Sequence, residues 1–254
     1  MVALVRDLRK RCSWDAAQTP QTLRPYLVEE ALELDHALGE DNPEQIKKEL
    51  GDLLLHVAFQ IVLGEERGAF GAEDVTRSVE EKMWRRHPHL FPDTQQPQTP
   101  GASPGSPATW EHAKAPERDV SGPGVLDGLP PNLPALIMAL RLQERAAGVG
   151  FDWPDAQGPL AKVREETGEL ESEMKARAAA DRVAEEIGDL LFAVVNVSRK
   201  LGCDPRAALQ KANARFLTRF RKMEALAKER GVEIRRAPLD DLDRLWEEAK
   251  EMTA

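Results

Sequence analysis

The clearest hydrophobic pattern in the chain is a pair of apolar runs, each of which follows a Gly-Asp dipeptide. After Gly51 and Asp52 the sequence reads LLLHVAFQIVL, and after Gly188 and Asp189 it reads LLFAVVNV. Neither run alternates between apolar and polar residues with a period of two, so both are predicted to be helices. Because a helix that is apolar nearly all round must be covered on every side, we expect these helices to pack on each other or on a second chain as a bundle.

The segments before the first apolar run are also helical in pattern. Pro25 stands near the expected start of one helix, the sequence GEDN after Leu38 breaks it, and Pro43 opens a second helix that continues through Leu63. No segment of the chain alternates convincingly with the period of a strand. The sequence therefore predicts an all-α protein.

The same motifs occur twice in the same order along the chain. A Trp- and Asp-rich segment, CSWDAAQTP or GFDWPDAQGP, precedes each copy. The matched pairs are VEEALEL from Val28 with REETGEL from Arg164, KELGDLLLHVAF from Lys48 with EEIGDLLFAVVN from Glu185, and WEHAK from Trp110 with WEEAK from Trp246. Such a repeat predicts a duplicated domain of about a hundred residues.

The repeats divide the chain into two domains joined by a linker. Residues 1–91 form the predicted N-terminal domain, with residues 110–118 as its returning tail, and residues 126–254 form the predicted C-terminal domain. Residues 92–109 are rich in Pro, Gly, Ser, Thr and Gln, which predicts a flexible linker. We expect each domain to be a four-helix-bundle type of unit that is completed by formation of a homodimer.

The composition narrows the classes of partner and the compartment. The 254 residues carry 44 acidic and 35 Lys and Arg side chains, a formal charge of −9. This balance argues against binding a nucleic-acid polymer, which needs a basic surface. Cys12 and Cys203 lie far apart, so neither a disulfide framework nor a thiolate zinc site is expected. The N-terminus lacks a signal-peptide pattern and the apolar runs are too short to span a bilayer, so we expect a cytoplasmic protein that binds no membrane.

Four carboxylates in each copy are spaced so that they can meet. Residues three apart share one face of a helix, so each copy has one pair on the helix before the break and another on the helix after it. Antiparallel packing of the two helices brings the pairs opposite each other. The residues are Glu30, Glu33, Glu49 and Asp52 in the first copy, and Glu166, Glu169, Glu186 and Asp189 in the second.

These carboxylates predict a metal site. Four carboxylates in one cleft repel one another unless protons or metal ions neutralise them. A ligand set of oxygen atoms alone suits Mg²⁺ or Mn²⁺ rather than zinc, and Mg²⁺ commonly binds carboxylates together with substrate phosphates. We therefore expect a phosphorylated substrate. Gly51 and Gly188 each cost about 1 kcal/mol of helix propensity relative to Ala, which suggests that something approaches the helix backbone closely there.

The acidic motifs alone leave two other interpretations open. A single EExxE motif arises easily in an acidic chain, and a merely solvated acidic surface would make this a non-catalytic regulatory or scaffold protein. A di-iron oxidase bundle would need Glu-x-x-His pairs, and Glu33 with His36 fits that spacing. The second copy has Ser172 at the equivalent position, so the di-iron pattern does not repeat. Repetition of the whole carboxylate set favours a metal site.

The tandem pattern of EExxE followed by ExxD, together with CSWD, RRHPHLF and WExxK, resembles the MazG family. Members of this family are nucleoside triphosphate pyrophosphohydrolases of the all-α NTP pyrophosphatase superfamily. The resemblance covers essentially the whole chain apart from the linker. It implies Mg²⁺-dependent hydrolysis of an NTP, such as ATP, to a nucleoside monophosphate and pyrophosphate by a homodimer of tandem helical domains. A base-selective dNTP pyrophosphatase is the alternative within this class.

The resemblance also implies roles for residues of the second copy. Its four carboxylates would be the metal ligands, and with Glu165, which would orient or deprotonate the attacking water, they form the implied catalytic set. Trp246 would stack on the base, although taken alone it fits a core tryptophan better. Arg and Lys side chains would neutralise phosphate oxygens. The implied substrate contacts are Lys162, Arg182, Glu185, Arg215, Arg219, Trp246 and Lys250.

The first copy keeps the carboxylates but loses several positive charges. The replaced positions are Tyr26 for Lys162, Gln45 for Arg182 and His89 for Arg219. A well-placed hydrogen bond to a charged group contributes roughly 1.5–3 kcal/mol, so the first copy should hold a triphosphate less well. We therefore expect the second copy to carry most of the turnover, and the first metal site to be a weak active site, a regulatory site or a structural remnant.

Overall fold

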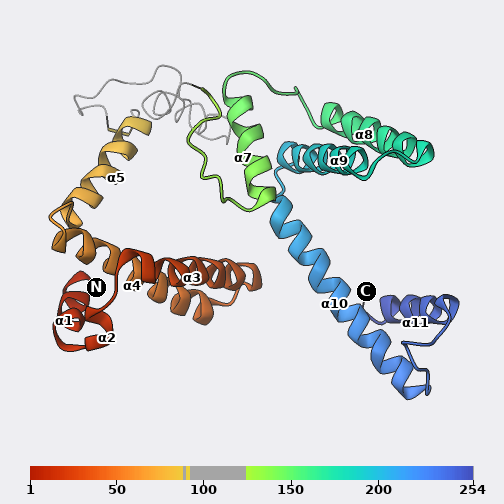
Figure 1. Cartoon of the computed structure of the whole chain (residues 1–254), viewed down its shortest axis with the longest axis horizontal. Coiled ribbons are helices and arrows are strands. Elements are labelled where there is room, and N and C mark those ends of the chain that lie inside the picture. Colours follow the sequence, from red (N-terminus) through yellow and green to blue (C-terminus); the bar gives the residue numbers. More distant parts are fainter. Residues whose placement is uncertain (88–89, 92–123, 254) are drawn as a thin grey trace. The chain divides into compact units, whose positions relative to one another are not determined.

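The computed structural model of the chain describes residues 1–87, 90–91 and 124–253. These residues form helices and no strand (Figure 1), which confirms the predicted all-α fold. Among the described helices, none is both long enough and apolar enough to cross a membrane.

The chain divides into two compact units, Met1–Gly105 and Ser106–Ala254. Each unit contains one copy of the carboxylate motifs. The predicted linker at 92–109 and the predicted tail at 110–118 lie outside the described residues, as does His89. The exact limits of the two domains therefore stay predictions.

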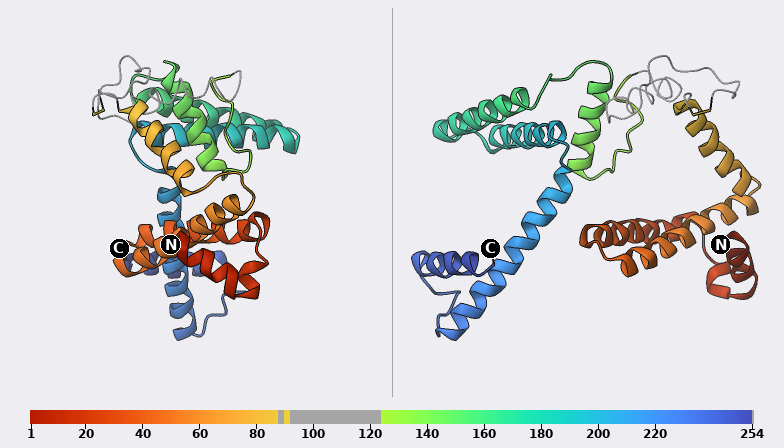
Figure 2. Two further views of the ribbon diagram at one scale, coloured as in Figure 1. Left: turned by 90° about the vertical axis from the view of Figure 1, so that its left-hand side faces the viewer. Right: turned by 180° about the vertical axis from the view of Figure 1, so that it is seen from behind.

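In the first unit, helices α3 and α4 form a hairpin, and α1 packs against α4 (Figure 2). The helices of this unit are α1 (Val2–Arg11), α2 (Ser13–Ala16), α3 (Pro20–Glu40), α4 (Pro43–Glu66) and α5 (Ala72–Arg86). One buried cluster joins α1, α3 and α4, and it consists of Val5, Leu23, Ala58, Phe59, Val62 and Leu63. Because Val5 comes from α1, Leu23 from α3 and the others from α4, this core fixes all three helices together.

Local sequence sets the ends of the α3–α4 hairpin. The side-chain oxygen of Thr19 caps α3, so the helix begins earlier than predicted and Pro25 lies inside it. Asp41 adopts a left-handed backbone conformation (φ 53°) and ends α3. Asn42 then caps α4, whose first residue is Pro43 as predicted. This short turn places the acidic faces of the two helices against each other.

In the second unit, α8 and α9 form the equivalent hairpin, and α7 packs against α9. A second hairpin of α10 and α11 follows, with its own buried cluster of Met223, Leu226, Ala227, Leu245 and Ala249. Figures 1 and 2 show α11 beside the far part of α10, away from α8 and α9. The helices of this unit are α7 (Ala135–Gly148), α8 (Gln157–Ala176), α9 (Ala180–Lys200), α10 (Pro205–Glu229) and α11 (Leu239–Glu251).

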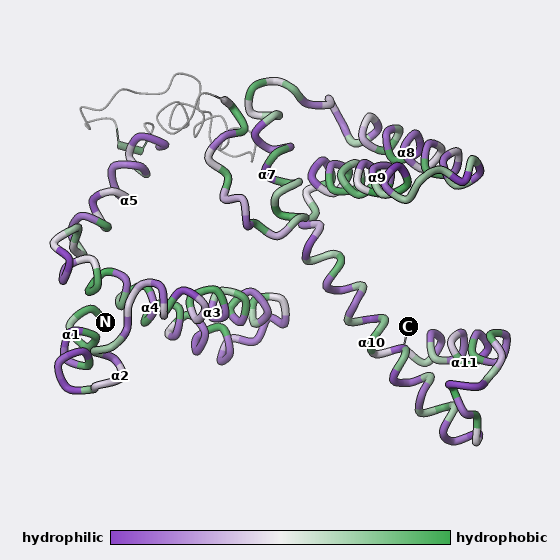
Figure 3. The backbone as a smooth tube through the Cα atoms, in the orientation of Figure 1, coloured by the Kyte–Doolittle hydropathy of each residue, from purple (hydrophilic) through white to green (hydrophobic). Residues whose placement is uncertain are grey.

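The apolar helices α4 and α9 are not covered on every side in the single chain. Hydrophobic residues recur along both helices (Figure 3), and each helix leaves one stripe of them exposed. The exposed stripes are Leu50, Leu54 and Val57 on α4, and Ile187, Leu191 and Val194 on α9. Each glycine of the Gly-Asp pairs faces open space, with no atom within 4 Å of a Cβ built on it. The predicted cover and close approach are therefore absent from the described part of one chain.

Candidate active site

The four predicted carboxylates of the second copy come together between α8 and α9. Oxygen atoms of Glu166, Glu186 and Asp189 all lie within 4.8 Å of one another. Glu166 is only 4% exposed and Glu186 only 7% exposed. Glu169 lies close to this group, because interaction with Glu166 is the main cause that raises the pKa of Glu169. Buried carboxylates are rare unless they are paired or bind a cation.

Electrostatic crowding marks this cluster as a site for a positive charge. The hydrogen bond with Glu166 raises the pKa of Glu169, and burial and repulsion from the Glu166 carboxylate add to the effect. A bound divalent cation would relieve this repulsion. Carboxylate oxygens are the ligands that Mg²⁺ and Mn²⁺ prefer, so the donor set fits the predicted class of metal.

Lys162 lies one helical turn before Glu166 on α8 and forms ion pairs with the cluster. Its Nζ lies 2.6 Å from Oε1 of Glu166 and 3.0 Å from Oε1 of Glu165. Hydrogen bonds to Glu166 and then to Glu165 raise the pKa of Lys162 well above its usual range. The lysine is therefore charged and partly neutralises the cluster. It also holds Glu165 near the cluster, although Glu165 is not one of the three carboxylates that lie closest together.

Arg182 neutralises the same cluster from the start of α9. Its guanidinium lies 2.6 Å from Glu185, 3.3 Å from Glu186 and 3.3 Å from Glu173. Glu173, the stronger of the two, and Glu185 raise the pKa of Arg182. The predicted contacts around the carboxylates thus form two ion-paired groups. One consists of Lys162 and Glu165, and the other of Arg182 and Glu185.

The remaining predicted contacts form a separate group on the α10–α11 hairpin. Arg215 is exposed on α10, and Nε of Arg219, one turn later, lies 3.4 Å from Oγ1 of Thr253. The ring of Trp246 packs against the buried cluster of that hairpin, with its centroid 5.3 Å from that of Phe216. Lys250 forms an ion pair of 2.8 Å with Glu247. Since α11 lies away from α8 and α9 (Figure 2), the single chain does not bring this group to the carboxylates.

The first copy assembles its carboxylates in the same way. Oxygen atoms of Glu30, Glu49 and Asp52 lie within 4.8 Å of one another. Repulsion from Glu49 is the main cause that raises the pKa of Glu33, with burial adding to it. The cation here is Lys48, whose Nζ lies 2.9 Å from Glu49 and 3.7 Å from Asp52. This lysine occupies the sequence position of Glu185.

A histidine that the sequence did not single out borders the first cluster. Nε2 of His56 lies 3.8 Å from Oε1 of Glu30, and the imidazole stacks on the ring of Tyr26 with the centroids 6.2 Å apart. Ala193 is the equivalent residue of the second copy, when the two ExxD motifs are aligned. The pair of rings thus occupies the place where the second copy has Lys162 and a small side chain.

A pocket of about 690 Å³ opens beside the second cluster. Lys162, Glu166 and Asp189 line one end of it, and Gln143, Asn196 and Arg199 are among the polar residues elsewhere in its wall. The rest is mainly apolar, including Phe151, Trp153 and Phe192. Pockets with an apolar wall and a few placed polar groups are typical of small-molecule sites. Nothing in the sequence pattern predicted this pocket.

Comparison with known proteins decides the family. The profile of the MazG nucleotide pyrophosphohydrolase domain matches the chain twice, at residues 18–91 and 156–223. The chain belongs to the MazG family. Each matched segment is one MazG domain and contains one carboxylate cluster, so the predicted tandem arrangement is confirmed.

Full-length relatives support the same assignment. The nucleoside triphosphate pyrophosphohydrolase/pyrophosphatase MazG of Thermotoga maritima is 44% identical over 253 residues, which cover 98% of this chain and 94% of that protein. A nucleoside triphosphate pyrophosphohydrolase of Escherichia coli is 38% identical over 249 residues, 97% of this chain and 93% of that protein. The uncharacterized protein YabN of Bacillus subtilis is 41% identical over 98% of this chain, which corresponds to 50% of its own length.

The two MazG domains differ in what lies beyond the carboxylates along the second helix of each hairpin. With the ExxD motifs aligned, Asn196, Arg199 and Lys200 of the second domain replace Phe59, Val62 and Leu63 of the first. All three residues of the first domain belong to its buried core. In the second domain, Asn196 and Arg199 line the pocket. Beyond the carboxylates, the second helix of the hairpin is therefore packed in an apolar core in the first domain and lines a pocket in the second. The pocket of about 580 Å³ in the first domain is lined instead by residues of α3 and by Gln45 and Glu49.

Proposed function

We propose that the chain hydrolyses nucleoside triphosphates to nucleoside monophosphates and pyrophosphate with Mg²⁺, for which Mn²⁺ can substitute, mainly in its second MazG domain. The observation that carries this proposal is the buried carboxylate cluster of Glu166, Glu186 and Asp189, which has Lys162 on it and a pocket beside it. The names of the Thermotoga and Escherichia relatives state the same reaction for those proteins.

In the second domain the metal would be held by Glu166, Glu169, Glu186 and Asp189. The first domain offers a second, weaker site, formed by Glu30, Glu33, Glu49 and Asp52. When bound, Mg²⁺ supplies neutralisation of the triphosphate charge and lowers the pKa of a coordinated water. The two buried glutamates fix the positions of their carboxylates, because both are packed between α8 and α9. Fixed ligands keep the reacting phosphate in one orientation.

The cations of the second domain would bind the triphosphate. Lys162 and Arg182 already lie within ion-pair distance of the cluster, so a phosphate that arrives there meets two positive charges. Lys162 acts as a point charge, and Arg182 offers a planar pair of donors. Glu165, hydrogen-bonded to Lys162, is placed to orient the water that cleaves the bond between the α- and β-phosphoryl groups. Glu185 keeps Arg182 directed along α9.

A homodimer would complete the site. The exposed stripes on α4 and α9 are the apolar surface that a second copy would cover, since apolar patches of this kind commonly mark interfaces. A second copy could also bring an α10–α11 hairpin, with Arg215, Arg219, Trp246 and Lys250, to the carboxylates. We place the protein in the cytoplasm, where its nucleotide substrate and its two free cysteines are expected.

A panel of the four NTPs and four dNTPs with Mg²⁺ tests the proposal, with pyrophosphate and orthophosphate measured separately. We expect pyrophosphate from several nucleotides, its loss when EDTA is added, and its recovery with Mg²⁺ or Mn²⁺. Release of orthophosphate alone would contradict the proposal. Activity on one dNTP only would indicate the base-selective alternative, and no hydrolysis of any nucleotide would favour a regulatory or scaffold protein.

A further inference from the structure

The pocket of the second MazG domain extends away from the carboxylates along α9. From Asp189 at one end to Asn196 is two turns of helix, roughly 10 Å at 1.5 Å per residue. Both residues line the same pocket, together with Lys162 and Gln143. A ligand whose phosphate lies at the carboxylates therefore has room for a further group, separated from that phosphate by about the length of a sugar.

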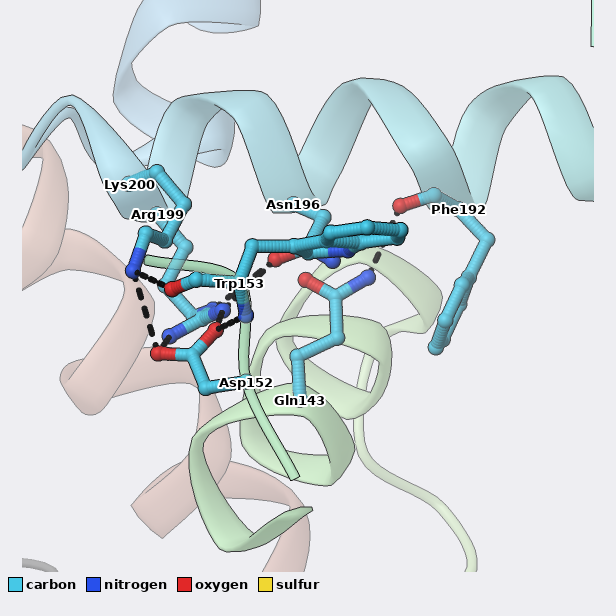
Figure 4. Close-up of polar contacts among 7 residues, drawn as sticks. All are labelled: Gln143, Asp152, Trp153, Phe192, Asn196, Arg199 and Lys200. Carbon is cyan, nitrogen blue, oxygen red and sulfur yellow. Dashed lines mark hydrogen bonds and ion pairs between the residues drawn. The ribbon is translucent and has the colours of Figure 1, made fainter. Parts of the chain in front are cut away.

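Gln143 of α7 presents a hydrogen-bond acceptor in this pocket that has no partner. Its side chain is 5% exposed, and Nε2 donates a hydrogen bond of 2.8 Å to the backbone carbonyl of Phe192. That bond fixes the orientation of the amide, since the reverse orientation would place two oxygens together. The other atom, Oε1, is buried and has no hydrogen-bond partner among the described residues. Figure 4 shows the nitrogen of Gln143 toward Phe192 and the oxygen on the other side.

An unpaired buried acceptor is costly and calls for an explanation. Leaving such a group without a hydrogen bond costs free energy, and native proteins contain few of them. Gln143 is one of the residues that line the pocket, and it belongs to neither of the two buried apolar clusters. A ligand that donates a hydrogen bond there would satisfy it.

Asn196 is also held in one orientation. Its Oδ1 accepts hydrogen bonds of 3.0 Å from Nε and 2.8 Å from Nη2 of Arg199, which leaves its NH₂ group on the opposite side of the amide. Arg199 in turn binds Asp152, so the network in Figure 4 is fixed at both ends. The pocket wall can therefore offer a ligand two groups, the NH₂ donor of Asn196 and the Oε1 acceptor of Gln143.

Trp153 gives the pocket an aromatic wall that is itself held in place. A Cβ added at Gly158 would lie 2.4 Å from the indole ring, so the ring packs directly on the backbone of α8 and depends on the absence of a side chain there. Lys200 donates a hydrogen bond of 2.6 Å to the backbone carbonyl of Trp153. A planar ring on this wall, with an amide acceptor nearby, suits a flat heterocycle that carries N–H groups.

We propose that this pocket binds the base of the nucleoside triphosphate, and that Oε1 of Gln143 accepts a hydrogen bond from an amino group or ring N–H on the base. The inference rests on the proposed function and assigns the nucleoside end of the same site. Adenine, cytosine and guanine each have an amino group, and uracil and thymine have the ring N3–H. Gln143 would thus select for a nucleobase without selecting strongly among the four.

Substrate analogues that lack only the amino group test this assignment. ATP is compared with purine riboside triphosphate, and CTP with pyrimidin-2-one riboside triphosphate, at saturating Mg²⁺. For the wild-type chain we expect KM to be on the order of ten- to a hundredfold lower for the amino-bearing member of at least one pair, as expected for pairing a buried acceptor. In Gln143→Met, which keeps the length of the side chain but removes the acceptor, this preference should fall to about one.

The same exchange at Gln60, which is half-buried on α4 of the first domain, is the matched control and should leave the preference unchanged. Circular dichroism and thermal unfolding establish whether each variant folds. Equal KM values for both members of each pair in the wild-type chain would overturn the inference without any variant. Persistence of the preference in folded Gln143→Met would also overturn it, by pointing to another base contact such as Trp246. In both cases pyrophosphate is still formed, whereas failure of the proposed function would show as no pyrophosphate at all.

Discussion

In the first MazG domain the part of α4 beyond the carboxylates is buried in a core, whereas in the second domain the equivalent part of α9 borders an open pocket. The two clusters themselves are closely alike, with three carboxylates within 4.8 Å in each. The difference lies in three positions, where Phe59, Val62 and Leu63 correspond to Asn196, Arg199 and Lys200. The comparison teaches that the same carboxylate hairpin can be combined with an apolar core in one domain and with a partly polar pocket wall in the other.

Ion pairs and hydrogen bonds hold the segment before each carboxylate hairpin in place, but the residues that supply the positive charge differ between the two domains. In the first domain Arg9 of α1 binds the backbone carbonyl of Asp15 at 2.6 Å and the carboxylate of Glu66 at 2.7 Å. In the second domain the acid is Asp152 of the segment itself, and the cations Arg199 and Lys200 come from α9. The second arrangement places cations in and next to the pocket wall, and there they orient Asn196 and Trp153.

The largest expected effect comes from removing one carboxylate of each cluster. Glu186→Ala should abolish nearly all hydrolysis, because it removes a buried carboxylate that we propose to hold the metal in the domain whose cluster also pairs with Lys162 and Arg182. Glu49→Ala should leave most of the activity. The measurement is pyrophosphate release at saturating Mg²⁺, with circular dichroism to check that both variants are helical. Equal losses would mean that both domains turn over, and the reverse order would assign catalysis to the first domain.

Filling the pocket should have the next largest effect. Asn196→Phe introduces into the second domain the residue that the first domain has at this position. We expect KM for NTPs to rise by on the order of a hundredfold, since the aromatic ring takes the space assigned to the base and the Asn196 donor is lost. Asn213→Phe, at an exposed position of α10, is the control and should change KM little. Unchanged kinetics in folded Asn196→Phe would show that the nucleoside lies elsewhere.

Charges on the exposed stripes test the dimer. Leu54→Glu and Leu191→Glu each place a carboxylate in a stripe that we expect a second copy to cover, and burying an unpaired charge is strongly unfavourable. Light scattering should show the wild-type chain as a dimer and the double variant shifted toward a 28.3 kDa monomer with reduced activity. Met174→Glu, at an exposed residue outside the stripes, should not shift the mass. A monomeric and fully active wild-type chain would contradict the proposed homodimer.

The smallest effect concerns the ion pairs of Asp152. Burial alone would raise the pKa of Asp152, but hydrogen bonds from Arg199 and Lys200 outweigh it and lower the pKa. A carboxylate with a lowered folded-state pKa stabilises the fold above its unfolded value of about 3.9, and this contribution is lost as the pH falls through the folded-state pKa. Asp152→Asn should therefore cost about 1–2 kcal/mol at pH 7, a difference that stays constant down to about pH 5 and shrinks below pH 4. Denaturant titrations at several pH values measure it, and a difference that grows toward acid would refute the assignment.

Much of the fold could be predicted from the sequence, because periodic patterns report it directly. The ExxD spacing placed Glu186 and Asp189 on one helix face, and the repeat gave the tandem domains. The start of α3 was misplaced because Pro25 is tolerated inside the helix and the cap at Thr19 was not recognised. One chain leaves a stripe of α4 and of α9 exposed, and the predicted cover by a second chain stays a prediction, because apolar content does not say whether the covering surface belongs to the same chain.

The pocket could not be predicted in the same way. It depends on the orientation of one amide, on a ring that packs against Gly158, and on space left between three segments, none of which produces a periodic signal. Gln143 and Trp153 also lie outside the segments that match the MazG domain profile. His56 was missed for a related reason, since its place beside Glu30 follows from helix packing and not from a spacing motif.

The continuous core of the first unit has a consequence for how the chain melts. That core ties α1, α3 and α4 together, whereas the buried cluster of the second unit lies in the α10–α11 hairpin and leaves α7, α8 and α9 around a pocket. The region that we propose to bind substrate should therefore be the first to lose its structure on heating, and calorimetry should show more than one transition. Nucleotide with Mg²⁺ should move the earlier transition upward and leave the later one nearly in place, because a ligand stabilises only the folded unit that binds it.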